Sequence, residues 1–151
     1  MKTRLLFILL SLLLCQWTIA QQTISSGKLI EYSRFNSTIV PSRDVFVWLP
    51  TDYSTKERYD VLYMHDGQML FDANTTWNKQ EWGIDEVVGK LLNEKKIRSC
   101  IVVGVANIPE TRYADYFPQK ALRNLPDSVV SGNVSFNADN YLRFLVEEVK
   151  P

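Results

Sequence analysis

The feature that most constrains the fold is an uninterrupted apolar run from Ile101 to Val105, which is β-branched except at Gly104. A run of this length without polar alternation is typical of a strand buried on both faces, as in a parallel sheet. Arg43 to Leu49 also predicts a strand covered on both faces. Val45, Val47 and Leu49 would lie on one face, and Phe46 and Trp48 on the other. We therefore expect a sheet that is covered on two sides.

Predicted strands and helices alternate in an order typical of an α/β fold. The strands are expected at residues 27–35, 43–49, 59–64 and 101–105, and a polar loop at residues 106–133. One helix is expected from Trp82 or Gly83 to Lys96, because its apolar residues recur every three or four positions. A second helix is expected from Asn137 to Lys150, with Asn137 or Asp139 as its N-cap. The apolar face of this second helix is predicted to consist of Tyr141, Leu142, Leu145, Val146 and Val149.

The composition excludes several classes of protein. The 17 basic residues balance the 17 acidic residues, which argues against a polybasic nucleic-acid-binding protein. An aromatic content of 12% is too high for a disordered chain. A length of 151 residues suffices for one domain with a buried core.

The N-terminus has the pattern of a secretory signal peptide. Lys2 and Arg4 precede the apolar run Leu5–Leu14, and Thr18 and Ala20 are small residues near the expected cleavage site. We expect residues 1–20 to be removed by cleavage after Ala20 and the mature protein to be secreted or periplasmic. The apolar run is shorter than the roughly 20 residues of a transmembrane helix, so no stable membrane span is expected.

The sequence contains few histidine and cysteine residues, which are common metal ligands. His65 is the single histidine, and Cys100 is the single cysteine of the predicted mature chain, so a structural zinc site is not expected. Cys100 starts an apolar run and is interpreted as a buried hydrophobic residue. Asp66, Asp72 and Asp85 are not spaced as a calcium loop, and Asp85 is predicted to be solvated on the polar side of its helix. No metal and no cofactor are expected.

Several segments, in order along the chain, resemble the putative-esterase branch of the α/β-hydrolase fold. This branch includes enterochelin esterases, feruloyl and acetyl-xylan esterases, S-formylglutathione hydrolases and mycolyltransferases. The segments are Val47-Trp48-Leu49-Pro50 with Tyr53, Val61 to Gly67, Trp82 to Glu86, and Val103 to Asn107 with Arg112, Tyr116 and Pro118. The resemblance implies that residues 21–151 are the N-terminal portion of an α/β-hydrolase esterase domain. Its mostly parallel sheet with flanking helices would be incomplete, because only the first half of the fold is covered.

The resemblance also implies the position of an oxyanion hole after the third strand. The backbone N–H of Gln68 would stabilise the negative charge on the reacting carbonyl oxygen, while Gly67 permits the turn and Asp66 braces it. His65, Asp66 and Arg112 would bind the substrate, and Arg112 would contact a carboxylate or stack on an aromatic acyl group. Two simpler interpretations stay open: Asp66-Gly67 as a plain turn dipeptide, and His65 as a residue that orders a loop.

The catalytic triad itself is not expected within the chain. No serine has the Gly-x-Ser-x-Gly pattern of the nucleophile turn, and the resemblance places the catalytic Ser, Asp and His beyond Pro151. We therefore expect an N-terminal fragment of an exported serine carboxylesterase that is inactive alone. The intact relative would act on a small-molecule or carbohydrate ester. Trp77 and Trp82 are expected to fill core or lid space.

Two other interpretations of the function stay open. The chain could be a non-catalytic secreted binding module that uses the first half of the fold. It could also be half of a split esterase, which needs a partner chain carrying the missing C-terminal half. An unfinished sheet would expose an unpaired edge, so either form needs something that covers it.

Overall fold

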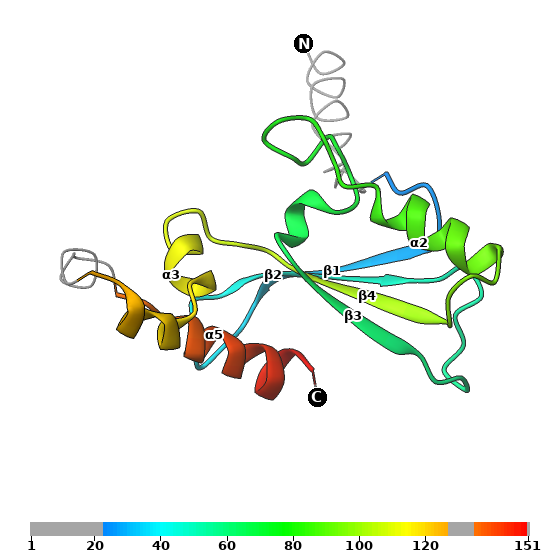
Figure 1. Ribbon diagram of the computed structural model, residues 1–151. Helices are drawn as coiled ribbons and strands as arrows, with labels where there is room; N and C mark the ends of the chain where they lie inside the picture. The colour runs from blue at the N-terminus through cyan, green and yellow to red at the C-terminus, as the bar shows by residue number, and fades with distance from the viewer. Residues whose placement is uncertain (1–22, 127–134, 151) are drawn as a thin grey trace, which may run out of the picture.

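The computed structural model describes residues 23–126 and 135–150, so the predicted signal peptide lies outside the described residues. Within these residues four strands form one sheet in the order β1-β2-β4-β3 (Figure 1). The strands are β1 (Lys28–Phe35), β2 (Arg43–Leu49), β3 (Asp60–His65) and β4 (Cys100–Val105). β4 pairs parallel with β3, as its unbroken apolar run predicts, whereas β2 pairs antiparallel with both β1 and β4. The sheet is therefore mixed in the described part of the chain.

Helices lie on both sides of the sheet (Figure 1). α2 (Ile84–Asn93) covers one face, and it begins after Gly83, whose φ of 59° is easily adopted only by glycine. α5 (Ala138–Phe144) covers part of the other face and continues as a π-helical turn, Leu145–Val149. Three shorter helical segments are the 3-10 helix η1 (Gly67–Met69), the five-residue helix α3 (Arg112–Tyr116) and the 3-10 helix η2 (Gln119–Asn124).

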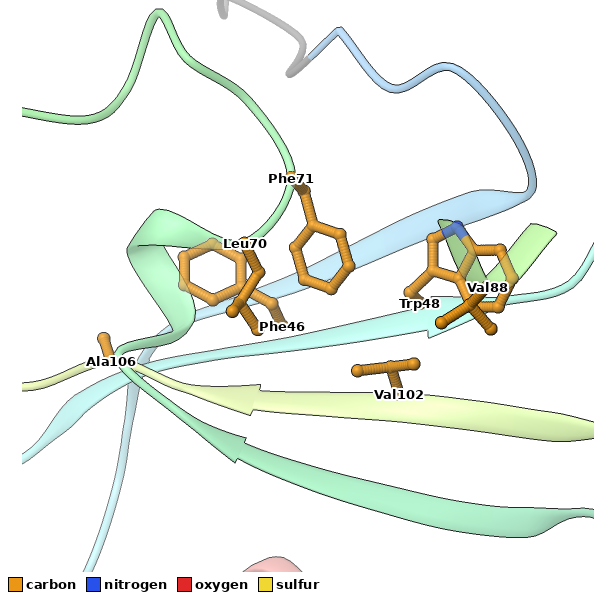
Figure 2. Packing of buried hydrophobic residues seen from close by; sticks show 7 residues of the cluster. All are labelled: Phe46, Trp48, Leu70, Phe71, Val88, Val102 and Ala106. Carbon is orange, nitrogen blue, oxygen red and sulfur yellow. The ribbon is translucent and has the colours of Figure 1, made fainter. Parts of the chain in front are cut away.

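The core on the α2 face is built around Trp48, which has no exposed surface. Figure 2 shows Phe46 and Trp48 of β2 and Val102 of β4 beside Leu70 and Phe71. The indole N–H of Trp48 donates a hydrogen bond of 2.7 Å to the carbonyl oxygen of Ser26, so its polar atom is satisfied inside the core. Full burial of a side chain such as Leu70 contributes about 1.5–3 kcal/mol to folding.

A second core lies on the opposite face of the same strands. Val45, Val103 and Val105 point to this face, where Tyr141 and Phe144 of α5 pack on them. Adjacent residues of β2 and β4 thus enter different cores, as the alternation of side chains along a strand requires. The prediction that these two strands are covered on both sides is confirmed.

The segment before β1 is tied to the start of α2 through Asp85. The carboxylate of Asp85 accepts hydrogen bonds from the backbone N–H groups of Ser25 at 2.6 Å and Ser26 at 3.3 Å. Asp85 is fully buried, and burial raises the pKa of its carboxyl group. The prediction that Asp85 is solvated is wrong, because the helical pattern shows the polar side of α2 but not the chain segment that covers it.

Two further predictions are corrected by the structure. Residues 106–133 are not simply a polar loop, since α3 and η2 lie within them. Of the predicted apolar face, Tyr141 of α5 is buried and Leu145 and Val149 of the following π-helical turn pack against the second core, whereas Leu142 and Val146 are 54% and 60% exposed. The apolar residues of this helical segment lie on more than one face. The face that packs on the sheet is the one with the rings of Tyr141 and Phe144.

Candidate functional site

The candidate site begins where β3 ends, at Asp66. This residue has φ 56° and ψ 42°, the left-handed conformation that non-glycine residues adopt rarely. The chain then forms η1, in which the N–H of Met69 donates to the carbonyl oxygen of Asp66 at 2.8 Å. The first N–H groups of a helix have no acceptor within it, so those of Gly67 and Gln68 are unused by η1 itself.

Gly67 lies directly against the backbone of β4. A Cβ atom at this position would be 2.6 Å from the carbonyl carbon and 2.8 Å from the carbonyl oxygen of Gly104. Real Cβ atoms do not come this close to backbone atoms, and a backbone cannot rotate away as a side chain can. The glycine is therefore required because the turn packs on the neighbouring strand.

The carboxylate of Asp66 is held by three side chains from the segment after β4. Arg112 donates two hydrogen bonds, from Nε to Oδ1 at 2.9 Å and from a terminal nitrogen to Oδ2 at 2.7 Å. Asn107 donates from its amide at 2.7 Å, and the hydroxyl of Tyr116 donates at 3.2 Å, both to Oδ1. We call these three residues, Asn107, Arg112 and Tyr116, the Asp66 clamp.

The surroundings of Asp66 and Tyr116 favour the ionised form of the first and the neutral form of the second. The hydrogen bonds from Arg112 are the largest cause that holds the pKa of Asp66 below its usual range, against the opposing effect of burial. Burial, together with the charge of Asp66, raises the pKa of the Tyr116 phenol. Asp66 is therefore an anion and Tyr116 a neutral donor at neutral pH.

A second connection joins the turn to the same segment. The backbone N–H of Asn107 donates to the side-chain oxygen of Gln68 at 3.1 Å. Because a backbone N–H can only donate, the amide oxygen of Gln68 must face it, and the amide NH₂ points away. Asn107 thus binds both Asp66 and Gln68, the first and last residues of the turn Asp66–Gln68.

His65 lies beside this turn with its side chain packed on two tyrosines. Its Nδ1 is 3.1 Å from the hydroxyl of Tyr141, and its ring centroid is 4.7 Å from that of Tyr116. Burial raises the pKa of Tyr141, which keeps its phenol neutral. The structure therefore brings the predicted site residues His65, Asp66, Gly67, Gln68 and Arg112 together.

α3 is anchored to the sheet by a buried ion pair. Asp115 lies 3.2 Å from a terminal nitrogen of Arg43 on β2, and the two side chains are only 2% and 1% exposed. The hydroxyl of Thr111 adds a hydrogen bond of 2.9 Å to Asp115. The helix that carries Arg112 and Tyr116 is thereby also bonded to β2.

Sequence reasoning missed the roles of Arg43, Asn107 and Asp115. Arg43 and Asp115 are 72 residues apart in sequence, so no local pattern pairs them. Asn107 belongs to a segment that carried the family resemblance, and its position after a buried strand was the available signal. Trp77 and Trp82 do not fill core space, since they are 86% and 50% exposed, and their place in a lid stays a prediction.

The described part of the chain has neither a metal-ligand cluster nor a membrane-spanning helix. No group of three or more histidine, cysteine, aspartate or glutamate side chains in residues 23–126 and 135–150 could hold a metal ion. Among the helices that the structure describes, none has the length and apolar character needed to cross a membrane. Cys100 is partly buried, and burial raises the pKa of its thiol.

Known structures share this fold. An IroE-like serine hydrolase from Shewanella oneidensis matches with a TM-score of 0.57 and 23% identity, over 81% of this chain and 36% of that one. The BES protein from Bacillus cereus matches with a TM-score of 0.53 and 19% identity, over 88% of this chain and 50% of that one. A ferulic acid esterase from Anaeromyces mucronatus is also similar, with a TM-score of 0.47 and 18% identity, over 88% and 44% of the two chains.

The match is partial in length, since this chain spans between 36% and 50% of these three solved chains. No match was found among curated proteins. The predicted fold class, an α/β-hydrolase type with flanking helices, is confirmed as a partial fold, although in the described part of the predicted mostly parallel sheet only the β3–β4 pairing is parallel. The model of the family described as "Putative esterase" matches residues 37–151, which is most of the chain. The chain therefore belongs to the putative esterase family.

Proposed function

We propose that this chain is the N-terminal part of an exported carboxylic ester hydrolase and that the turn Asp66–Gln68 forms part of its oxyanion hole. Membership of the esterase family supports the reaction class. The observation that carries the proposal is the turn itself, whose first helical N–H groups are unused within η1 and whose Asp66 side chain is hydrogen-bonded by the Asp66 clamp.

The proposed chemistry is acyl transfer. Attack on an ester carbonyl develops negative charge on the carbonyl oxygen, and N–H groups fixed in advance stabilise that charge without reorganising. Gln68 would supply one such N–H, and the residue after the nucleophilic serine would supply the second. In this proposal the serine and its histidine and aspartate partners follow Pro151 in the complete protein.

The acid and alcohol parts of the substrate are not assigned. Substrate binding by His65, Asp66 and Arg112 stays a prediction, because the hydrogen bonds described for these side chains join them to other parts of the protein. No metal ion or cofactor takes part in the proposed reaction.

The first experiment determines the size of the native secreted product with an antibody against residues 27–150. A band about twice the length of this chain, as the matched shares of the solved relatives suggest, would support the proposal. Labelling of that band by a fluorophosphonate probe, which reacts with activated serines, would support serine chemistry. A band of the mature chain's own length without labelling would contradict the proposal and favour a binding module or a split esterase.

A further inference from the structure

We propose that the Asp66 clamp positions the oxyanion-hole turn, so that Arg112 is a positioning residue of the esterase and not a ligand for the substrate. This inference rests on the function proposed above. It differs from the sequence-based expectation that Arg112 contacts a carboxylate or an aromatic acyl group. The two roles require different behaviour of kcat and KM, so they can be separated.

The turn needs support from outside itself. The left-handed conformation of Asp66 is unfavourable for a residue with a Cβ atom, and it persists only where surrounding contacts enforce it. The clamp residues Asn107, Arg112 and Tyr116 are 41, 46 and 50 residues away in sequence. The conformation of the turn therefore depends on tertiary contacts with one segment, the loop after β4 and α3.

The carboxylate of Asp66 is fully engaged by the clamp. It accepts four hydrogen bonds, which is about the number that the two oxygens of a carboxylate can accept. Its side chain is only 10% exposed. Asp66 is thus neither a free base nor a free ligand, and its charge serves to hold the turn.

The same contacts use one edge and one face of the Arg112 guanidinium. Two nitrogens of its guanidinium bind Asp66 side by side, the bidentate arrangement that fixes orientation most strongly, and the guanidinium carbon lies 5.1 Å from the ring centroid of Tyr116. A substrate carboxylate could not use this edge of the guanidinium without displacing Asp66, although the Arg112 side chain is 52% exposed and its other N–H groups are not engaged by Asp66. Lysine could keep the charge but not the paired hydrogen bonds.

We infer that the clamp resists displacement, because its helix α3 is bonded both to β2 and to Asp66. Asp115 holds α3 to β2 through the buried Arg43, while Arg112 and Tyr116 reach from the same helix to Asp66. A shift of α3 would therefore move the turn. Misplacement of a catalytic group by about 1 Å can lower a rate by about 100-fold.

The test compares Arg112→Ala, Arg112→Lys and Tyr116→Phe in the complete secreted protein. The control is Arg143→Ala on α5, which removes an exposed pair with Glu147 of the following π-helical turn. Each variant is assayed with p-nitrophenyl acetate and with mono-p-nitrophenyl succinate, which carries a free carboxylate. For Arg112→Ala we expect kcat to fall about 10- to 100-fold on both esters with KM changed less than about twofold, because the lost contact acts on the turn.

The other variants sharpen the distinction. Arg112→Lys should recover part of kcat, Tyr116→Phe should lower kcat less than Arg112→Ala, and Arg143→Ala should leave both constants unchanged. A rise in KM confined to the succinate ester would overturn the inference and make Arg112 a substrate ligand. An unchanged kcat in Arg112→Ala would also overturn it.

Hydrogen exchange separates failure of this inference from failure of the proposed function. A wild-type protein that hydrolyses neither ester and resists fluorophosphonate labelling would contradict the proposed function. The clamp is then judged by amide exchange of the peptide covering residues 66–70. Faster exchange in Arg112→Ala and Arg112→Lys, but not in Arg143→Ala, would support the clamp, and equal exchange in all proteins would refute it.

Discussion

Removal of the charge of Asp115 is expected to destabilise this protein strongly. Its partner Arg43 is almost fully buried at an N–O distance of 3.2 Å, and the second terminal nitrogen of Arg43 has no hydrogen-bond partner among the described residues. In Asp115→Asn the guanidinium would stay in the core without a counter-charge, with the rings of Tyr141 and Phe144 4.9 Å and 5.6 Å away. Two unit charges at this separation attract by about 5 kcal/mol at an effective dielectric constant of about 20. Breaking a buried pair costs about 3–5 kcal/mol, so we expect a loss of that size.

Urea unfolding followed by tryptophan fluorescence measures this loss. The matched control, Arg143→Ala, removes a pair whose side chains are half exposed, and should leave the free energy of unfolding nearly unchanged. The double variant Arg43→Met/Asp115→Leu should recover most of the loss, because replacing both charges by apolar groups removes the cost of burying them. A loss below about 1 kcal/mol in Asp115→Asn, or a double variant as unstable as the two single changes added together, would refute the reasoning.

Three further perturbations test other parts of the fold. Gly67→Ala should cost at least about 1–3 kcal/mol in urea unfolding, because its Cβ would meet backbone atoms of β4; a neutral change would contradict the close packing. Trp48→Phe should cost at least about 1–3 kcal/mol in the same assay, because the carbonyl oxygen of Ser26 loses its buried donor. Asp66 has a lowered pKa, mainly through Arg112, so its stabilisation is present above the unfolded-state pKa and is lost as the pH falls through the lower folded-state value. Asp66→Asn should therefore flatten the acid side of the stability–pH curve, and an unchanged acid side would contradict the assignment.

The strands could be predicted from sequence because their evidence is local. Arg43–Leu49 was predicted with the bounds that the structure gives, and the 101–105 run differs by one residue at its start. Both have apolar side chains on two faces, a pattern that few other structures satisfy. The prediction that α2 extends to Lys96 is three residues too long, because helix ends depend on caps more than on periodicity.

α3 could not be predicted in the same way. It has five residues, too few for a helical period, and isolated helices of this length are unstable. Its stability comes from the contacts of Asp115 with Arg43 and of Arg112 with Asp66, which join residues far apart in sequence. A segment rich in charge and proline was therefore interpreted as a loop.

For the candidate site, too, the residues could be predicted from sequence but their contacts could not. The resemblance to esterases indicated Asp66, Gly67, Gln68 and Arg112 one by one, and the structure brings them together. What the sequence did not contain was the direction of the Arg112 side chain. An exposed arginine after a strand is equally compatible with a substrate and with a carboxylate of the protein, and only the distances to Asp66 favour the second.

The position of these contacts in the chain has a consequence for how an esterase site could be assembled. Each hydrogen bond described for the carboxylate of Asp66 comes from residues 107–116, and α3 is fixed to β2 within the same portion of the fold. The hydrogen bonds to the Asp66 carboxylate and the ion pair of α3 therefore lie within residues 43–116, while Tyr141 of α5 packs beside them against His65 and Tyr116. In the proposed enzyme, the segment carrying the nucleophile would meet an oxyanion-hole turn that is already formed, which is the condition for electrostatic stabilisation without reorganisation.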